Sequence, residues 1–575
     1  MKTSRVAVAL GALAAVAMPV LAMAAVQFTQ SPPLTQVVTA PVGPVAAGPV
    51  QVPIITWGGD IATIYANGNA KSTARTSLFG KLGLNLNLVR EDVFAKQLEA
   101  YLSGKSPYLR GTLGMINMAA EAAAKDPRTK PVVVYQLTWS SGGDALVVKG
   151  NVKSTKDLKG KSVAVQAYGP HVDYLAKVLA DAGLSMKDVS IKWVADITGG
   201  AKSPAAALRD GSVDAAMVII PDALALSSNG TVGTGAEDSV KGARILLSTK
   251  TANRIIADVY AVRSDYLQAN RAAVESFVSG LLQGHEALRQ LVANKAGRAA
   301  EYKQTLTAAA QILLDSPQAV SDAEGMYADA DFAGMNGNQA FFAKAGNPRG
   351  FAPLNKEIQA AFGTIGLASQ AVALDHAKWD YARLGGGAGA ASAPLAETRR
   401  FDSEKVATIV ARKQQQGRLG EGELFSFEVL FQPNQDKFSA DLYSDAFKRV
   451  AGLAATYGGA VITVEGHSDP MAYLRARKDG ASPVVLSRTQ QSAKNLSLSR
   501  AAAVRDSIVT YAKSQGTSID PSQFAVVGHG IAQPKSGICS GEPCAPKDEQ
   551  AWKSNMRVEF RIIQIEAESS AFKPL

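Results

Sequence analysis

The chain has 575 residues, of which 47% are hydrophobic and 19% are charged, which is typical of a soluble globular protein and excludes a membrane channel. Its length predicts about three or four folding units. Each unit is large enough to bury a core without a metal or disulfide framework. The net charge of +10 is spread along the chain with no long basic run, which argues against a nucleic-acid partner. A diffuse basic surface suits anionic wall polymers, or is simply well solvated.

Residues 1–24 have the pattern of an export signal. Lys2 and Arg5 precede an apolar stretch over residues 6–21, and residues 22–24 supply the small-x-small pattern of a cleavage site. A transmembrane anchor is the alternative, but the stretch is shorter than the about 20 residues that span a bilayer. No cysteine follows it, which excludes a lipoprotein. We therefore expect export to the periplasm of a Gram-negative bacterium.

Two segments of low complexity divide the rest of the chain. Residues 25–53 are rich in Pro, Val, Ala and Thr, which predicts an extended tether. Residues 385–423 begin with a Gly/Ala-rich run that can form neither a stable helix nor a packed strand, and they read as a linker and lead-in. The predicted domains are therefore residues 54–384 and residues 424–575.

The first domain alternates strand-like and helix-like segments. Residues 132–135, 162–165 and 215–220 are candidate buried strands, and residues 172–182 form an amphipathic stretch that ends at Gly183. A second amphipathic helix is expected over residues 268–293. Strands separated by helices predict an α/β fold with a largely parallel sheet.

Two stretches of this domain resemble a known family. Residues 152–165, with Leu158, Gly160 and Lys161, and the helix-turn-strand pattern of residues 205–216 are similar to the type 2 periplasmic solute-binding proteins, in the branch for nitrate, sulfonates and thiamine precursors. The resemblance covers residues of about 54–300. It implies two α/β lobes joined by crossovers near residues 148 and 257, with a small, anionic solute held between them.

Loops that follow predicted strands are the candidate solute contacts. Ligands of open α/β sheets bind beyond the carboxyl ends of strands, where helix N-termini attract anions. The candidates are Trp57, Asp60, Ser140, Ser141, Gly169, His171 and Asp222. Each has a plainer interpretation, since Trp57 can be a core residue and His171 a surface residue. None of the five histidines stands in a motif with a nucleophile, so we predict no catalytic residue, no metal, no cofactor and no enzyme.

The C-terminal domain carries four motifs in order. They are a strand ending in Gly-His-Ser-Asp at residues 466–469, a helix with Leu-Ser-Arg-Ala at 498–501, Gly-His-Gly at 528–530 with Pro534, and Asn-Met-Arg-Val-Glu-Phe at 555–560. Together they resemble the OmpA-like peptidoglycan-binding domain over residues of about 424–565. The resemblance implies an α+β fold that follows the two-lobed domain.

In that family an Asp and an Arg hold the diaminopimelate of the wall stem peptide. By position these are Asp469 and Arg500, with Asn434 as a lesser contact. A zwitterionic ligand suits this pair, because the carboxylate can meet its ammonium and the guanidinium its carboxylate. The alternative is that Asp469 and Arg500 pair with one another. The sequence departs from the pattern in a long inserted loop around residues 471–494 and in Met556, where a second Arg is common.

Cys539 and Cys544 frame a short segment with Gly541 and Pro543, which favour a tight turn. Export would place both thiols in an oxidising compartment, so a disulfide is expected, with two free thiols as the alternative.

The sequence thus predicts a periplasmic solute-binding protein anchored to peptidoglycan, associated with the cell wall and a candidate for the inner face of the outer membrane. An inner-membrane permease is a candidate partner. The alternative is a structural or sensory wall protein whose lobes bind a protein or nothing.

Overall fold

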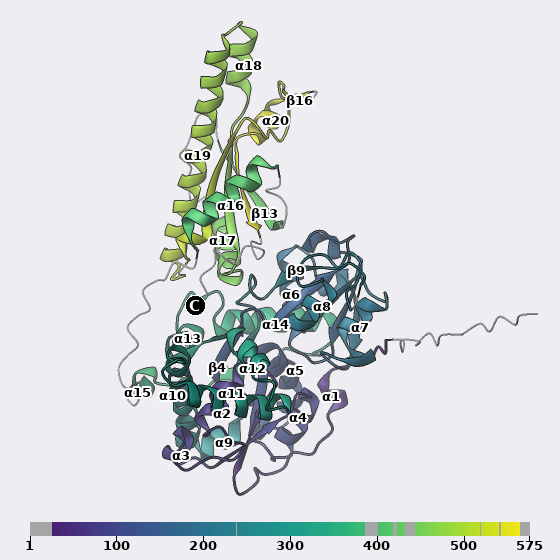
Figure 1. The fold of residues 1–575 in the computed structure, drawn as a ribbon, viewed down its shortest axis with the longest axis vertical. Coiled ribbons are helices and arrows are strands. Elements are labelled where there is room, and N and C mark those ends of the chain that lie inside the picture. Colours follow the sequence, from purple (N-terminus) through teal and green to yellow (C-terminus); the bar gives the residue numbers. More distant parts are fainter. Residues whose placement is uncertain are drawn as a thin grey trace, which may run out of the picture.

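The computed structural model describes residues 26–236, 238–385, 401–417, 423–431, 443–517, 519–539 and 542–563. The predicted signal at residues 1–24 and most of the predicted Gly/Ala-rich linker lie outside these ranges. The described chain forms two α/β lobes and a C-terminal α+β domain, which stands at the top of Figure 1.

Lobe 1 is built from two separate stretches of chain. Its main sheet has the order β11-β4-β10-β3, and β1 and β2 pair in parallel beside it. The strands and main helices of the first stretch are β1 (Val50–Ile54), α2 (Asp60–Ala66), α3 (Leu78–Lys81), β2 (Leu86–Arg90), α4 (Phe94–Leu102), β3 (Tyr108–Thr112), α5 (Leu113–Ala123) and β4 (Pro131–Ser140). The second stretch supplies β10 (Ala257–Arg263), α9 (Ser264–Ala269), α10 (Arg271–Ala293), α11 (Ala299–Leu314), α12 (Val320–Ala328), β11 (Ala330–Phe332), α13 (Gly334–Phe342), α14 (Phe351–Ile365), β12 (Asp375–His376) and α15 (Tyr381–Gly385).

Lobe 2 is the continuous segment between these stretches. Its sheet has the order β7-β6-β8-β5-β9. Its strands and helices are β5 (Asp144–Val148), β6 (Ser162–Gln166), α6 (His171–Asp181), β7 (Ser190–Val194), α7 (Pro204–Arg209), β8 (Ala215–Ile219), α8 (Ile220–Leu226) and β9 (Arg244–Ser248). The candidate strands at residues 132–135, 162–165 and 215–220 are all present, and the predicted helices are α6 and α10.

The sheets are less parallel than the sequence predicts. In lobe 2, β6 pairs in parallel with β7 and with β8, whereas β5 is antiparallel to both its neighbours, β8 and β9. In lobe 1, β10 is antiparallel to β3 and β4. The reason is the double crossover. β5 and β10 are the strands that directly follow a crossover, and each runs opposite to the strands on both its sides.

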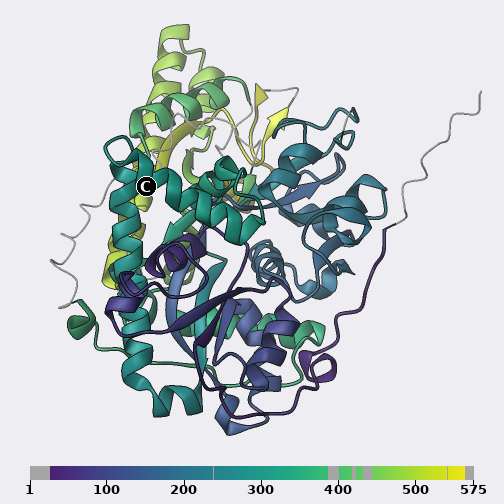
Figure 2. The ribbon, with the colours of Figure 1, turned by 60° about the horizontal axis from the view of Figure 1, so that its bottom comes forward.

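The crossovers lie at residues 141–143 and 249–256, between β4 and β5 and between β9 and β10. The predicted position near 257 is close, whereas residue 148 is the last residue of β5 and already belongs to lobe 2. Figure 2 shows the two lobes joined by these passages.

Residues 26–53 differ from the expected free tether. Phe28 forms a bridge with Val194 of lobe 2, and Tyr168 donates a hydrogen bond to the carbonyl of Pro32 at 2.6 Å. Leu34, in the short helix α1 (Leu34–Val37), is buried against lobe 1, and Val50 begins a strand of its sheet. Proline favours an extended backbone, but the apolar side chains between the prolines gain more by packing than by remaining in water.

The C-terminal domain has a four-stranded sheet of order β13-β18-β14-β15, in which β14 and β15 run in parallel. Its strands are β13 (Glu423–Leu430), β14 (Val461–His467), β15 (Phe524–Gly530) and β18 (Arg557–Ile563), with the short pair β16 (Ile538–Cys539) and β17 (Glu542–Pro543). Its helices are α16 (Ser403–Gln415), α17 (Ser444–Thr456), α18 (Met471–Lys478), α19 (Pro483–Ser514) and α20 (Glu549–Ser554).

The alternation along β14 explains how both faces of this sheet are covered. Ile462 and Val464 point to the face under α17 and α19, and Val461 packs with Val406 and Ile409 of α16 on the other face. The lead-in after the linker therefore contains a helix that is an integral part of the C-terminal domain.

Candidate functional site

A buried polar cluster occupies the end of lobe 1 that faces the crossovers. Arg110 of β3 places Nη2 2.8 Å from Asp60 Oδ2 and Nη1 2.8 Å from Asp258 Oδ1. Asp60 is the first residue of α2, and Asp258 is the second residue of β10, just after the second crossover. All three side chains are buried, and a guanidinium that meets two carboxylates is the arrangement that makes burial of such charges tolerable.

Trp57 and Thr138 extend this cluster to the first crossover. Trp57 Nε1 donates to Thr138 Oγ1 at 3.0 Å, and Thr138 Oγ1 donates to Asp258 Oδ2 at 2.9 Å. The indole also covers Gly143, where a Cβ would lie 2.5 Å from Trp57 Cζ3. The ring therefore contacts both lobe 1 and the crossover.

The predicted residues Ser140 and His171 meet at Asp144, the first residue of lobe 2. Ser140 Oγ donates to Asp144 Oδ2 at 2.6 Å, and His171 Nε2 lies 2.7 Å from Asp144 Oδ1. Thr249 Oγ1 of the second crossover lies 2.9 Å from Ser140 Oγ and accepts from the backbone of Asp144. One hydroxyl thus ties the two crossovers together.

Asp173 lies on the first turn of α6 in lobe 2 and faces lobe 1. Its carboxyl lies against the first turn of α5, where a Cβ at Gly114 would be 2.6 Å from Asp173 Cγ. It is 3% exposed, and neither carboxyl oxygen has a hydrogen-bond partner among the described residues. An unpaired carboxyl at a lobe interface is costly unless something else satisfies it.

Burial sets the protonation of this region. Loss of hydration raises the pKa of Asp173 to about 8, and the charges of Glu357 and Asp258 add to that rise. Burial also raises the pKa of Asp60 to about 7, against the opposing effect of Arg110. The pKa of Asp258 is raised for the same reason, in part by Asp144 of lobe 2. The carboxyls of the two lobes are therefore close enough to influence each other. We call Asp60, Arg110, Asp144, His171, Asp173 and Asp258 the interlobe cluster.

The other predicted contacts have different roles. Ser141 lies in the crossover, where its N–H donates to the carbonyl of Asp329 at 2.8 Å. Gly169 is buried beside Gln166, whose Oε1 would be 2.2 Å from a Cβ at this position, so the glycine serves local packing. Asp222 lies on α8, and among the described residues no hydrogen bond or ion pair joins it to the interlobe cluster.

Sequence reasoning missed Arg110, Asp144, Asp173 and Asp258. An arginine within the β-rich run of residues 108–112 was a usable signal, because a charged residue in a buried strand needs a partner. Asp173 stands only two residues beyond the predicted His171. Asp144 and Asp258 carry no local signal, because their importance comes from the crossover geometry.

Asp469 and Arg500 both lie at the turn that follows β14. Arg500 is 1% exposed, its Nη1 lies 3.4 Å from the carbonyl oxygen of His467, and its guanidinium stands over the ring of Phe431. Asp469 is partly exposed and accepts a hydrogen bond from the N–H of Met471 at 3.0 Å. Asn434 lies outside the described residues.

The expected loop at residues 471–494 is helical. It forms α18 and the first turns of the 32-residue helix α19, so that Arg500 lies in the middle of a helix rather than at its start. Ser482 caps α19 through the N–H of Val485, and Pro483 occupies its first position. Figure 1 shows this helical hairpin at the upper end of the molecule.

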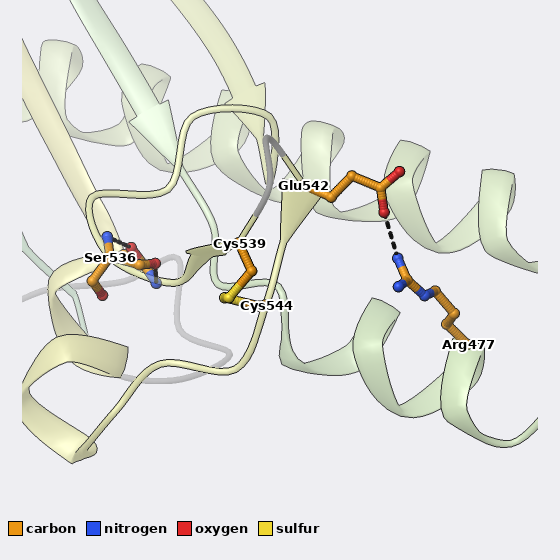
Figure 3. The surroundings of a disulfide bond; sticks show 6 residues. Arg477, Ser536, Cys539, Glu542 and Cys544 are labelled. Carbon is orange, nitrogen blue, oxygen red and sulfur yellow. Dashed lines mark hydrogen bonds and ion pairs between the residues drawn. A yellow bond between two sulfur atoms is a disulfide. The ribbon is translucent and has the colours of Figure 1, made fainter.

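The predicted disulfide is present, since Cys539 and Cys544 are bonded and join β16 to β17. Figure 3 shows it beside the ion pair in which Arg477 Nη1 of α18 lies 2.8 Å from Glu542 Oε2. The helical hairpin of α18 and α19 is thereby linked to the hairpin of β16 and β17, which the disulfide closes.

Comparisons with known proteins concern the two-lobed half. Residues 77–290 match the family model described as NMT1/THI5 like. This match supports the binding-protein resemblance of the first half of the chain and ends before the C-terminal domain. No curated protein matches the sequence.

Among solved structures, the periplasmic aliphatic sulphonate binding protein SsuA from Escherichia coli is 18% identical, with 57% of this chain and 90% of that chain covered and a TM-score of 0.40. A putative periplasmic sulfonate-binding protein SsuA from Methylobacillus flagellatus KT is 20% identical, with 58% and 91% covered and a TM-score of 0.39. The periplasmic nitrate-binding protein NrtA from Synechocystis PCC 6803 is 14% identical, with 49% and 70% covered and a TM-score of 0.33.

Within the described residues, no helix combines the length and the apolar character needed to cross a membrane.

Proposed function

We propose that this chain is a periplasmic solute-binding protein, without enzymatic activity, whose C-terminal domain holds it to peptidoglycan. The observation that carries the first half of this proposal is the interlobe cluster. Its members come from both lobes and from the residues beside both crossovers, so that any rotation of the lobes about the crossovers would separate Asp173 from α5. A solute that binds between the lobes would then select the closed arrangement through its greater affinity for that state.

The interlobe cluster also bears on the charge of the solute. It contains four carboxyl groups but only one guanidinium and one imidazole. The sequence predicts an anionic solute, because helix N-termini attract anions, but the N-terminus of α5 already faces the carboxyl of Asp173. We therefore favour a small solute that presents a cationic or hydrogen-bond-donating group to Asp173.

A binding screen tests this half. The purified full chain would be mixed with small amines, amidines, aminopyrimidines, nitrate, sulfonates and phosphate, and thermal unfolding would be followed. A compound at 100 times its Kd stabilises the protein by about 2.7 kcal/mol, which is a readily measured rise in Tm. Loss of the shift in Asp173→Ala, with the shift retained in Asp222→Ala, would place the solute in the interlobe cluster. Binding of anions alone would contradict the proposed charge.

The wall-binding half rests on the position of Asp469 and Arg500 at one turn of the C-terminal domain. Asp469 is exposed enough to meet an ammonium group, and Arg500 reaches the same turn from α19. We propose that diaminopimelate of the stem peptide is bound here. The test is sedimentation of the chain with purified sacculi. Asp469→Asn and Arg500→Lys should lose binding, while Asp479→Asn and Arg505→Lys, which make the same two changes at other positions of the C-terminal domain, should keep it. Equal sedimentation of all four variants would refute this site.

A second function is favoured by one specific observation. Lys177 Nζ of lobe 2 lies 3.4 Å from Glu357 Oε2 of lobe 1, so an ion pair of the protein's own side chains joins the two lobes. A structural or sensory wall protein that binds no solute would need no more than this. An inner-membrane permease would be a partner only under the first function. If no compound in the screen raises Tm and the chain still binds sacculi, the second function is favoured.

A further inference from the structure

Three side chains of the types that commonly bind metals meet inside the C-terminal domain, on the face of the sheet that α16 covers. Glu465 and His467 are alternate residues of β14, and His529 is on the parallel strand β15. Side chains two apart on a strand share a face, and neighbouring strands place theirs alongside. One ligand atom from each of the three residues lies within 4.8 Å of the others, and all three residues are buried.

His467 is the member whose environment is unusual. Its side chain is completely buried, and neither Nδ1 nor Nε2 has a hydrogen-bond partner among the described residues. Its nearest carboxylate oxygen is Glu559 Oε2, 3.9 Å from Nε2 and beyond hydrogen-bond distance. Leaving buried polar atoms unpaired destabilises a protein, so an imidazole in this position needs a further partner.

The other two residues are already oriented. His529 Nε2 lies 2.8 Å from Glu465 Oε2, and its ring stacks on that of His467 with the centroids 4.7 Å apart. Thr463 Oγ1 donates to Glu465 Oε1 at 2.7 Å, which leaves Oε2 directed at the histidines. The side-chain amide of Gln414, on α16, lies 3.3 Å from His529 Nδ1. An outer group on the second ring nitrogen is what metal-binding histidines in general possess.

We propose that Glu465, His467 and His529 bind one divalent transition-metal ion, of which Zn²⁺ is the representative. Two imidazole nitrogens and one carboxylate oxygen form a donor set that such ions prefer, and a water molecule would complete four-coordination. Donor atoms on a tetrahedral Zn²⁺ are about 3.3 Å apart, given bonds of about 2.0–2.1 Å. The rings of His467 and His529 are stacked with their planes 14° apart, so their in-plane lone pairs run side by side, and the rings must turn relative to each other to bind the same ion.

The charged side chains around the site pair with one another. Arg557 and Arg561 lie nearby, but both pair with Glu559, and Arg561 also contacts Glu465. Binding of the ion at His529 Nε2 requires the tautomer with the proton on Nδ1. If the side-chain amide of Gln414 flips, its oxygen can accept a hydrogen bond from that N–H.

The site would fasten β14 to β15 directly below the turn that carries Asp469. Because Arg500 also contacts the carbonyl of His467, the ion would stabilise the turn that follows β14. This inference concerns the C-terminal domain alone and does not depend on either half of the proposed function.

The test is metal titration of the full chain, purified without a histidine tag and stripped with a chelator. Isothermal titration with Zn²⁺ should give one equivalent with a Kd of micromolar or tighter, and Co²⁺ should give the visible absorption of a four- or five-coordinate complex. His467→Phe and His529→Phe keep a stacked ring, and Glu465→Gln keeps the shape of the carboxyl. Each should weaken Zn²⁺ binding by more than the about 10–100-fold that loss of an outer partner costs.

His376→Phe is the matched control, because it makes the same change at a histidine of lobe 1 and should leave the titration unchanged. A measurement on the wild-type chain tests the proposal even if a variant fails to fold. Wild-type crystals grown with Zn²⁺ should give a zinc-edge anomalous peak between the three side chains. No binding by the wild-type chain, equal binding by all variants, or an anomalous peak elsewhere would each overturn the proposal.

Discussion

The hydroxyl of Tyr457, in the C-terminal domain, donates a hydrogen bond to Asp181 Oδ2 of lobe 2 at 2.9 Å. Asp181 is the last residue of α6, the helix that carries Asp173 at its other end, and it also forms an ion pair with Lys177. Two backbone hydrogen bonds continue the contact to the second crossover, from Arg254 to Thr456 and from Gly459 to Thr251. The C-terminal domain thus contacts lobe 2 and a crossover at once.

Removal of this hydroxyl should loosen the contact between the domains. Tyr457→Phe deletes a hydrogen bond to a carboxylate, which is worth about 1.5–3 kcal/mol. We expect faster hydrogen exchange at the amides of Arg254 and Gly459, measured by mass spectrometry on the full chain. Tyr443→Phe, which removes a hydroxyl that donates to Leu430 within the C-terminal domain, should leave both amides unchanged. Equal exchange in the two variants would mean that Tyr457 does not hold the contact.

Loss of the guanidinium at the centre of the interlobe cluster should be severe. Arg110→Met leaves Asp60 and Asp258 buried without their partner, and breaking a buried ion pair in this way costs about 3–5 kcal/mol. Urea unfolding of the full chain measures the effect. Arg298→Met, which breaks an exposed pair with Glu301, should change the free energy of unfolding by less than about 1 kcal/mol. A similar, small loss in both would show that the buried pair adds no stability.

The carboxyl of Asp173 should make the protein less stable as the pH rises. Its pKa is raised from 3.8 to about 8 in the folded chain, so the folded state binds more protons than the unfolded state between those values. The contribution of Asp173 to stability is therefore fully present below about pH 4 and is lost as the pH approaches 8. Asp173→Asn should flatten the dependence of Tm on pH and raise Tm above that of the wild type at pH 8.5.

Asp479→Asn, on the exposed turn between α18 and α19, is the control for this experiment. It should leave the slope of Tm against pH as it is in the wild type. An Asp173→Asn variant with the wild-type slope would show that Asp173 is ionised in the folded chain at neutral pH.

The disulfide should protect both cysteines from alkylation until the protein is reduced. Iodoacetamide should add nothing to the native or urea-unfolded chain and should add two groups after reduction, as measured by intact mass.

The disulfide should contribute little to global stability. A loop of this length contributes about 2 kcal/mol at most by the chain-entropy model. Because the hairpin is largely exposed, Cys539→Ser with Cys544→Ser should change the global Tm little. A large fall in Tm would mean that the hairpin supports the domain core.

Much of the local structure could be predicted from the sequence because it depends on near neighbours. The apolar runs at residues 162–165 and 461–464 become strands, and the amphipathic stretch after Pro170 becomes α6, which stops before Gly183. The pairing of Cys539 with Cys544 follows from five residues of separation and a turn-forming segment. Ser140 and His171 were predicted to face the same cleft because loops after strands converge in any sheet of this kind. The structure brings both to Asp144, and their role as solute contacts stays a prediction.

Three features depended on contacts between distant residues and could not be predicted in this way. The segment with prolines before residue 53 reads as a tether, but it packs because Leu34 and Val50 find apolar partners in lobe 1. Residues 471–494 read as an inserted loop because the span from Asp469 to Arg500 is longer than is usual in the family that the domain resembles, whereas in the structure α18 and α19 pack against each other. Asp173 reads as an ordinary acidic residue of a first helical turn.

The sequence by itself determined the order of the two halves, the positions of most strands and helices, and the residues expected at the wall-binding turn. The first two follow from composition and periodicity, which act over a few residues, and the third is what the resemblance to a known family implies. Only the tertiary structure decided which charges meet. Arg110 lies between Asp60 and Asp258, and His467 lies beside Glu465 and His529, because crossovers and parallel strands bring together residues up to about 150 positions apart. In a buried setting the energy of each such group depends on its neighbours in space, and the neighbours are set by the fold.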